Sequence, residues 1–239
     1  MLAHLTVSKF VDHLPFYRQI QIFKRQNLIL SDSTLNGWFN ATSELLTPLY
    51  DVLQKQLLQS NYIQADESPI GVQDSHKKGA LHTGYQWVYR SPVERLVLFK
   101  YHPSRQRKAP EEMLKDFTGT LQTDGYQAYQ NMRTKGNIER LACMAHARRY
   151  FDKAQENDKV RAEYMLKQMQ RLYEIEQKAR ERNIDRCTRF ETRKRYRQLR
   201  AKPVLAEIKD WLDKNISQVL PKSAIGKAVA YTLNLWPQL

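Results

Sequence analysis

The chain has 239 residues, 41% of them apolar, so it is long enough to bury one full-sized hydrophobic core and a smaller second unit. Its 39 Lys and Arg residues outnumber its 25 Asp and Glu residues, and the formal net charge of +14 is typical of proteins that bind nucleic acid. The sequence has neither an apolar run of the roughly 18–20 residues that a membrane-spanning helix needs nor an N-terminal secretory signal. We therefore expect a cytoplasmic protein without a membrane partner.

The first part of the chain, residues 1–60, has the pattern of a helical segment. Residues 14–42 predict two helices around a polar break, because Pro15 suits the first turn of a helix and Ser31 offers a cap for the second. A further helix is expected over residues 44–59.

This segment has the outline of a helix-turn-helix, with Lys24 and Arg25 at the junction between the two helices. The alternative is an ordinary helical hairpin with Leu35, Trp38 and Phe39 in its core. The sequence leaves both interpretations open.

The middle of the chain changes to short runs of β-branched and aromatic residues bounded by turn residues, which predicts strands. A turn at Ser91 and Pro92 would join the second and third strands in a hairpin. Helices are expected between the third and fourth strands, between the fourth and fifth, and again from Ala145. The expected strands are residues 61–66, 85–90, 95–102, 119–124 and 137–144.

Three strands in a meander, followed by alternating helices and strands, predict an α/β fold. We expect a ribonuclease H-like core over residues 61–155, with a mixed five-stranded sheet and flanking helices. Residues 156–220 have almost no strand pattern and predict a basic helical insertion. Its basic run is either a solvated helix face or a DNA-backbone contact. Residues 221–239 have the pattern of a capped apolar helix that is only beginning.

Two carboxylates stand at the ends of expected strands. Asp66 closes the first strand and Asp124 closes the fourth, and these strands are neighbours in the expected fold, so both side chains should enter one crevice. Paired acidic oxygens are the ligands that Mg²⁺ or Mn²⁺ needs for phosphodiester chemistry with two ions. The alternative is structural, since Asp124-Gly125 is a common turn dipeptide and Asp66 could belong to a strand exit. Glu67 should point to the opposite face of the strand, which makes it the weaker ligand candidate.

Cys143 and His146 have the spacing of half a zinc site, but no second pair of Cys or His residues completes four ligands. We expect a buried Cys at a strand end and a His that begins the next helix. Cys187 stands alone, so a disulfide scaffold is excluded. Neither a nucleophilic triad nor a phosphate-binding Gly-rich loop is indicated.

Seven ordered segments of the sequence match one known family. They are HLPFYRQIQIFKRQNLILSDSTLNGWF, ADESPI, GYQWVYR, YHPSRQRKAPEEML, LQTDGYQAY, CMAHARRYF and LPKSAIGKAVAYTLNLWPQL. In this order they resemble the central domain of transposases of the insertion sequence 66 family.

This resemblance implies a cut-and-paste enzyme with a DDE catalytic core of ribonuclease H type, interrupted by a helical insertion. It implies that Asp66 and Asp124 are the first two catalytic, metal-binding carboxylates, with Mg²⁺ or Mn²⁺ in a two-ion site. It also implies DNA as partner (transposon ends and target), assembly with itself or with full-length transposase, and a bacterial, nucleoid-associated location. The DNA contacts that we expect from the basic residues are Lys24, Arg25, Arg105, Arg148, Arg149, Arg193, Lys194, Arg195 and Arg197.

The family pattern has two parts that this sequence lacks: an N-terminal zinc-binding region, and a third acid, a Glu, that follows the segment matching AYTLNLWPQL. Glu207, Asp210 and Asp213 lie in the expected insertion and are poor substitutes. We therefore expect a fragment with an incomplete metal site and little strand-transfer activity alone. Two function classes remain: a transposase catalytic domain, or a catalytically dead fragment that binds DNA or transposase.

Overall fold

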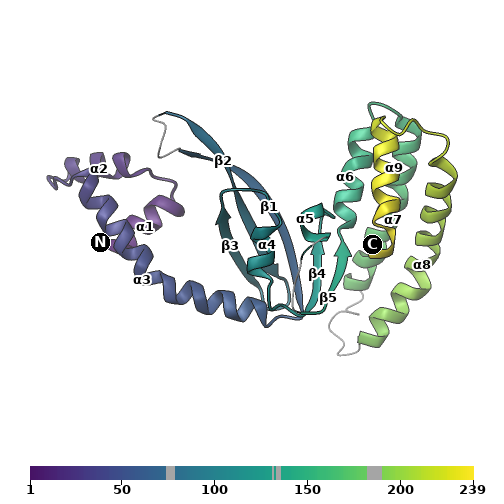
Figure 1. Ribbon diagram of the computed structural model, residues 1–239, viewed down its shortest axis with the longest axis horizontal. Coiled ribbons are helices and arrows are strands. Elements are labelled where there is room, and N and C mark those ends of the chain that lie inside the picture. The colour runs from purple at the N-terminus through teal and green to yellow at the C-terminus, as the bar shows by residue number, and fades with distance from the viewer. Residues whose placement is uncertain (74–78, 131, 133–135, 182–189) are drawn as a thin grey trace.

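A computed structural model of the chain describes all residues except 74–78, 131, 133–135 and 182–189. The molecule is elongated, with a helical unit at the N-terminal end, a sheet in the middle and a second helical unit beside the last strand (Figure 1). His76 and Cys187 lie outside the described residues.

The N-terminal unit consists of α1 (Leu2–Phe10), α2 (Phe16–Arg25) and the first part of α3 (Asp32–Leu58). Each helix contributes a buried side chain, respectively Leu5, Phe23 and Leu35. The predicted cap is confirmed, since the Ser31 hydroxyl accepts a hydrogen bond from the Thr34 amide at 3.1 Å. The two predicted helices are therefore present, as both interpretations require, and α1 joins them as a helix that the sequence analysis did not predict.

The expected break between residues 42 and 44 is wrong, because α3 is one continuous helix of 27 residues. The polar residues that suggested a break turn their hydroxyls back onto the helix: Thr42, Ser43 and Thr47 donate to the carbonyls four residues earlier. Polar residues therefore remain inside this helix, which also contains Pro48.

The predicted mixed sheet is confirmed. Its five strands are β1 (Tyr62–Gln73), β2 (Leu81–Ser91), β3 (Leu96–His102), β4 (Gly119–Thr123) and β5 (Ile138–Ala142). They lie in the order β3-β2-β1-β4-β5, in which β2 is antiparallel to both β1 and β3, while β4 is parallel to both β1 and β5. The predicted β2–β3 hairpin forms at the Ser91-Pro92 turn. Short helices α4 (Lys108–Met113) and α5 (Gln127–Gln130) connect the later strands.

The first strand is longer than predicted, so Asp66 does not close it. β1 continues to Gln73 because it pairs with β2 over ten residues, whereas its pairing with β4 ends at Gln64. Beyond Gln64, β1 has only β2 as a neighbour among the described strands, and such an edge position tolerates a proline like Pro69.

One face of the sheet, here called the closed face, carries the larger apolar core. Alternating strand residues such as Ile63, Trp87 and Tyr89 are buried there against α4, α5 and the end of α3. The opposite face, here called the open face, carries the intervening residues, among them Asp66 and Val88.

The second helical unit comprises α6 (Met144–Ala154), α7 (Lys159–Glu181), α8 (Phe190–Asn215) and α9 (Ala224–Asn234), followed by the short 3₁₀ helix η1 (Trp236–Gln238). These helices share a separate apolar core, against which Trp211 and Trp236 are partly buried. The predicted helical character of this part is confirmed. Two details differ from prediction: α6 belongs to this core, not to the core of the sheet, and α9 is a full helix, capped by Ser223 and packed on α6.

Candidate active site

Asp66 lies on the open face of β1, beside the parallel neighbour β4. Its side chain is 54% exposed, and its Oδ1 accepts a hydrogen bond from the Glu67 amide at 2.9 Å. Among the residues that the structure describes, Asp66 has no ion pair with Lys or Arg. Its charge is therefore available to a ligand.

Asp124 follows directly after β4, in a turn that fixes its carboxylate. Its Oδ1 accepts the Tyr126 amide at 2.9 Å, and the Gly125 amide donates to the Thr123 hydroxyl at 3.2 Å. From α9, the Tyr231 hydroxyl donates a short hydrogen bond to the Asp124 carbonyl. Both the start of the α5 connection and the second helical unit thus hold this residue in place.

His146 reaches the same place from the first turn of α6. Its Nε2 lies 4.0 Å from Oδ2 of Asp66. Its buried Nδ1 has no partner of standard hydrogen-bond geometry in the described part of the chain, and the neighbouring Cys143 thiol is the group placed beside it. The interaction with Cys143 raises the pKa of His146, helped by the charges of Asp66 and Asp124 and opposed by burial, and the same interaction lowers the pKa of the Cys143 thiol.

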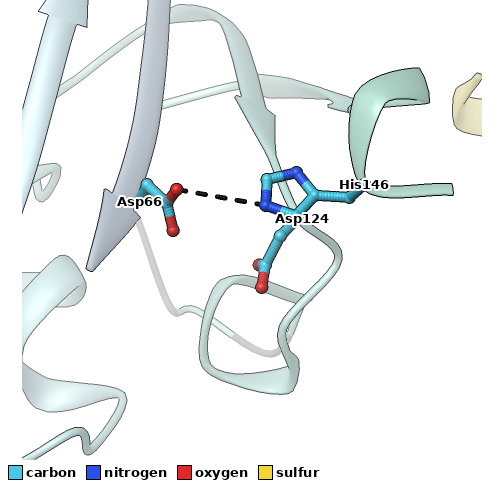
Figure 2. A group of neighbouring side chains, drawn as sticks. All are labelled: Asp66, Asp124 and His146. Carbon is cyan, nitrogen blue, oxygen red and sulfur yellow. Dashed lines mark ion pairs between the residues drawn. The ribbon is translucent and has the colours of Figure 1, made fainter. Parts of the chain in front are cut away.

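Figure 2 shows the three side chains converging from a strand, a loop and a helix. One ligand atom from each of Asp66, Asp124 and His146 lies within 4.8 Å of the others. They line a cavity of about 220 Å³ together with Val88 and Arg90 of β2. Two carboxylate oxygens and an imidazole nitrogen are a donor set that suits Mn²⁺ and, through the oxygens, Mg²⁺.

All 239 residues match the family model described as "Transposase IS66 family". The chain belongs to the IS66 family of transposases. It is 33% identical over its full length to an uncharacterised protein, y4jD, of Sinorhizobium fredii, of which it covers 48%, and 27% identical over 98% of its length to y4qI of the same organism, of which it covers 45%. The chain thus spans about half the length of the curated relatives it matches. In the part of this IS66 chain that the structure describes, every helix is too short or too polar to cross a membrane.

Glu67 of the IS66 chain lies on the closed face, as strand alternation predicted. Its side chain is 1% exposed. Arg105 donates to its Oε1 from Nε at 2.8 Å and from Nη2 at 2.6 Å, and Tyr129 donates to its Oε2 at 2.9 Å. Burial raises the pKa of Glu67, while the hydrogen bonds from Arg105 and Tyr129 oppose that rise. Glu67 is a structural carboxylate, held on the face of the sheet opposite Asp66.

The basic residues predicted to bind DNA fall into two groups. Arg105, Arg193 and Arg197 are engaged within the IS66 chain, the first with Glu67 and the other two with Glu176 of α7. The others, Lys24, Arg25, Arg148, Arg149, Lys194 and Arg195, have no ion pair with an acidic residue in the described ranges.

Sequence reasoning missed two members of this site. His146 was interpreted as structural, and Arg90 was not considered. For His146 the sequence did contain a helical pattern, because His146 and Arg149 are three residues apart and therefore share one face of α6. No local signal placed Arg90, which reaches the site only through the register of β2 on β1.

Proposed function

We propose that this chain carries the ribonuclease H-like catalytic core of a DDE transposase, which cleaves phosphodiesters at transposon ends and joins them to target DNA. The observation that carries the proposal is the meeting of Asp66 and Asp124 from adjacent parallel strands on the open face of the sheet. The strand order, with an antiparallel meander followed by two parallel strands, supports the fold assignment.

In this proposal Asp66 and Asp124 hold Mg²⁺ or Mn²⁺, and His146 offers a nitrogen beside them. The donor set fits, since hard oxygens meet without a Lys or Arg partner among the described residues. When bound, such ions polarise a phosphodiester and activate a water or a 3′-hydroxyl. The chain's own contribution is rigid placement: the Tyr126 amide and the Tyr231 hydroxyl fix Asp124, and the Glu67 amide fixes Asp66.

A third carboxylate does not stand beside this pair among the described residues. The three acids considered as a substitute third ligand all lie on α8 and form ion pairs there. Glu207 pairs with Arg171 of α7, Asp210 with Lys214 and Asp213 with Lys209. We therefore propose that the two-ion site is incomplete and that this chain alone has little strand-transfer activity.

We further propose that DNA runs along the basic residues without acidic partners. Lys24 and Arg25 extend from the N-terminal unit, and Lys194 and Arg195 from α8. On α7 and α8, Glu176 is already shared by Arg193 and Arg197, so the neighbouring Lys194 has its charge free for a phosphate. Assembly with a second copy or with full-length transposase stays a prediction.

The test is Mn²⁺-dependent nicking of supercoiled plasmid by the purified chain. Asp66→Asn and Asp124→Asn should each lower nicking by at least about 100-fold, because each removes a charged ligand from the reacting centre. Glu112→Gln, an exposed acid on α4 at the closed face, is the matched control and should nick like the unmodified chain. Equal nicking by all four proteins would overturn the assignment of the two carboxylates.

The alternative is a DNA-binding fragment without catalysis, which the net charge of +14 and the incomplete acidic set favour. It predicts salt-dependent DNA binding that survives Asp66→Asn, because backbone binding rests on Lys and Arg. Binding without nicking, in a chain shown to be folded, would select this alternative.

A further inference from the structure

A second cavity adjoins the carboxylate site. It measures about 160 Å³ and shares Asp124 and His146 with the cavity described above. Its remaining lining comes from Arg149, Tyr150 and Lys153 of α6 and from Tyr231 of α9. Any group that enters this cavity therefore lies next to the carboxylate pair.

The side chains from α6 form one stripe on that helix. His146, Arg149, Tyr150 and Lys153 are separated by three, one and three residues, which places them along a single face. One end of the stripe meets Asp66, and the other carries two cations.

The walls of the cavity are fixed by aromatic contacts. The rings of Tyr150 and Tyr231 are stacked, with centroids 4.3 Å apart and an interplanar angle of 27°. The Tyr231 hydroxyl donates to the Asp124 carbonyl, so the same side chain ties this wall to the turn that carries Asp124. The part of α6 that carries the two cations is thereby held against the turn that carries Asp124.

Arg149 and Lys153 are exposed and have no acidic partner in the described part of the chain. Neither Arg149 nor Lys153 forms an ion pair there, in contrast to Arg161 of α7, which pairs with Asp158. Two unpaired cations in a walled cavity favour an anion with several oxygens. A phosphate group matches, because Arg presents a planar fork to it and Lys adds a point charge.

We propose that Arg149 and Lys153 form a phosphate subsite for the DNA backbone, which takes the phosphodiester adjoining the one presented to Asp66 and Asp124. This inference rests on the proposed function, since it assumes that the scissile bond lies at the carboxylates. The subsite positions the strand and contacts no reacting atom, so Arg149 and Lys153 are positioning residues.

The experiment measures equilibrium binding of a fluorescein-labelled DNA duplex by anisotropy, in EDTA, over a series of salt concentrations. Binding in EDTA requires no catalysis, so it is independent of nicking. Arg149→Ala/Lys153→Ala should weaken binding and reduce the slope of log affinity against log salt by about one to two, since each lost cation releases about one counterion fewer. Arg149→Lys should retain most of the slope because it keeps the charge.

The matched control is Lys108→Ala/Lys115→Ala, which removes the same charge from α4 and its C-terminal end, at the closed face. This variant should keep the slope of the unmodified chain. Thermal unfolding of each variant by circular dichroism checks that the fold is intact. Equal slopes for the two double variants would overturn the subsite.

A second arm distinguishes DNA from free phosphate. Titration calorimetry with inorganic phosphate should show no saturable binding at concentrations where the duplex is bound. Phosphate binding that the Arg149→Ala/Lys153→Ala variant loses, with DNA binding unchanged, would overturn the assignment to a DNA phosphodiester.

The nicking assay separates this inference from the proposed function. Nicking that depends on Asp66 and Asp124, with an unaltered salt slope for Arg149→Ala/Lys153→Ala, would keep the chemistry and reject the subsite. A reduced slope together with nicking that does not depend on Asp66 and Asp124 would support the phosphate contact and overturn its link to cleavage at the carboxylates.

Discussion

Two neighbouring carboxylates on opposite faces of the sheet differ in exposure and in hydrogen-bond partners. On the closed face, Glu67 is 1% exposed and both of its oxygens are held by hydrogen bonds from Arg105 and Tyr129. On the open face, Asp66 is 54% exposed and has no Lys or Arg partner among the described residues. The two residues are adjacent in the chain, and strand alternation alone sends them to opposite sides.

The difference shows that residues of one strand can stabilise the fold on one face and remain available to a ligand on the other. A buried charge is tolerated only where partners offset its desolvation, and those partners leave it no capacity for a ligand. An exposed carboxylate contributes little to folding and keeps its charge for a ligand. The comparison therefore predicts that substitutions on the closed face lower stability, whereas substitutions on the open face change function.

The largest effect is expected from a matched pair of Phe residues. Phe117 is fully buried in the core under the closed face, whereas Phe99 is 55% exposed on β3, opposite Val88 of the open face. Phe117→Ala should lower the free energy of unfolding by about 3–5 kcal/mol, because it leaves a cavity in a packed core. Phe99→Ala should change it by less than about 1 kcal/mol. Urea unfolding measures both, and similar losses would contradict the distinction between the faces.

An intermediate effect is expected for Glu67→Gln. The amide keeps the shape of the side chain but has only one acceptor oxygen, so a hydrogen bond from either Arg105 or Tyr129 is lost. We expect a loss of roughly 1–3 kcal/mol at neutral pH, moderated because Arg105 is partly exposed and can turn to solvent. Asp66→Asn, one residue away, should unfold like the unmodified chain.

The pH dependence of this effect has a defined sign. Burial raises the pKa of Glu67 in the folded state above that of an unfolded chain. The stability that this group contributes is therefore fully present below its unfolded pKa, about 4.3, and is lost as pH rises through the folded pKa. The stability difference between the unmodified chain and Glu67→Gln should shrink from pH 4.5 towards neutral pH. A difference that grows over this range would contradict the raised pKa.

The smallest effect on stability is expected at the turn of the open face. Gly125 has φ +82°, and a Cβ placed there would lie 2.5 Å from Cδ1 of Leu235. Gly125→Ala should lower the free energy of unfolding by about 1–2 kcal/mol, because alanine is strained in a left-handed backbone conformation. It should also reduce nicking, because it displaces Asp124. Gly37→Ala, in an open position of α3, is the control and should be neutral or slightly stabilising.

The sequence predicted those parts of the fold that local patterns determine. Short runs of β-branched and aromatic residues bounded by turn residues located the strands, and the Ser91-Pro92 turn located the hairpin. The placement of Asp66 beside Asp124 followed from the expected neighbours β1 and β4, and the structure brings the two side chains together. These predictions held because each rests on residues close in sequence or on one parallel strand pair.

Most of the features that failed depend on distant contacts. The extension of β1 through Pro69 needs β2 as its partner. The continuity of α3 is a local exception, since its Ser and Thr hydroxyls donate to carbonyls only four residues earlier. The position of His146 depends on how α6 leaves β5, which Cys-x-x-His spacing does not encode. The charge of Arg149 was recognised, but the cavity that it lines exists only once Tyr231 of α9 packs on α6.

The continuous helix α3 has a mechanical consequence. Leu35 is buried in the N-terminal unit and Leu57 in the core of the sheet, so both ends of the helix are anchored. Leu57 follows Leu35 by 22 positions, which correspond to about 33 Å along the helix axis, close to one turn of B-form DNA. The N-terminal unit and the sheet are therefore linked by one unbroken helix, and in the proposed function a duplex that binds both Lys24 and Arg25 and the carboxylate site would have to span this separation.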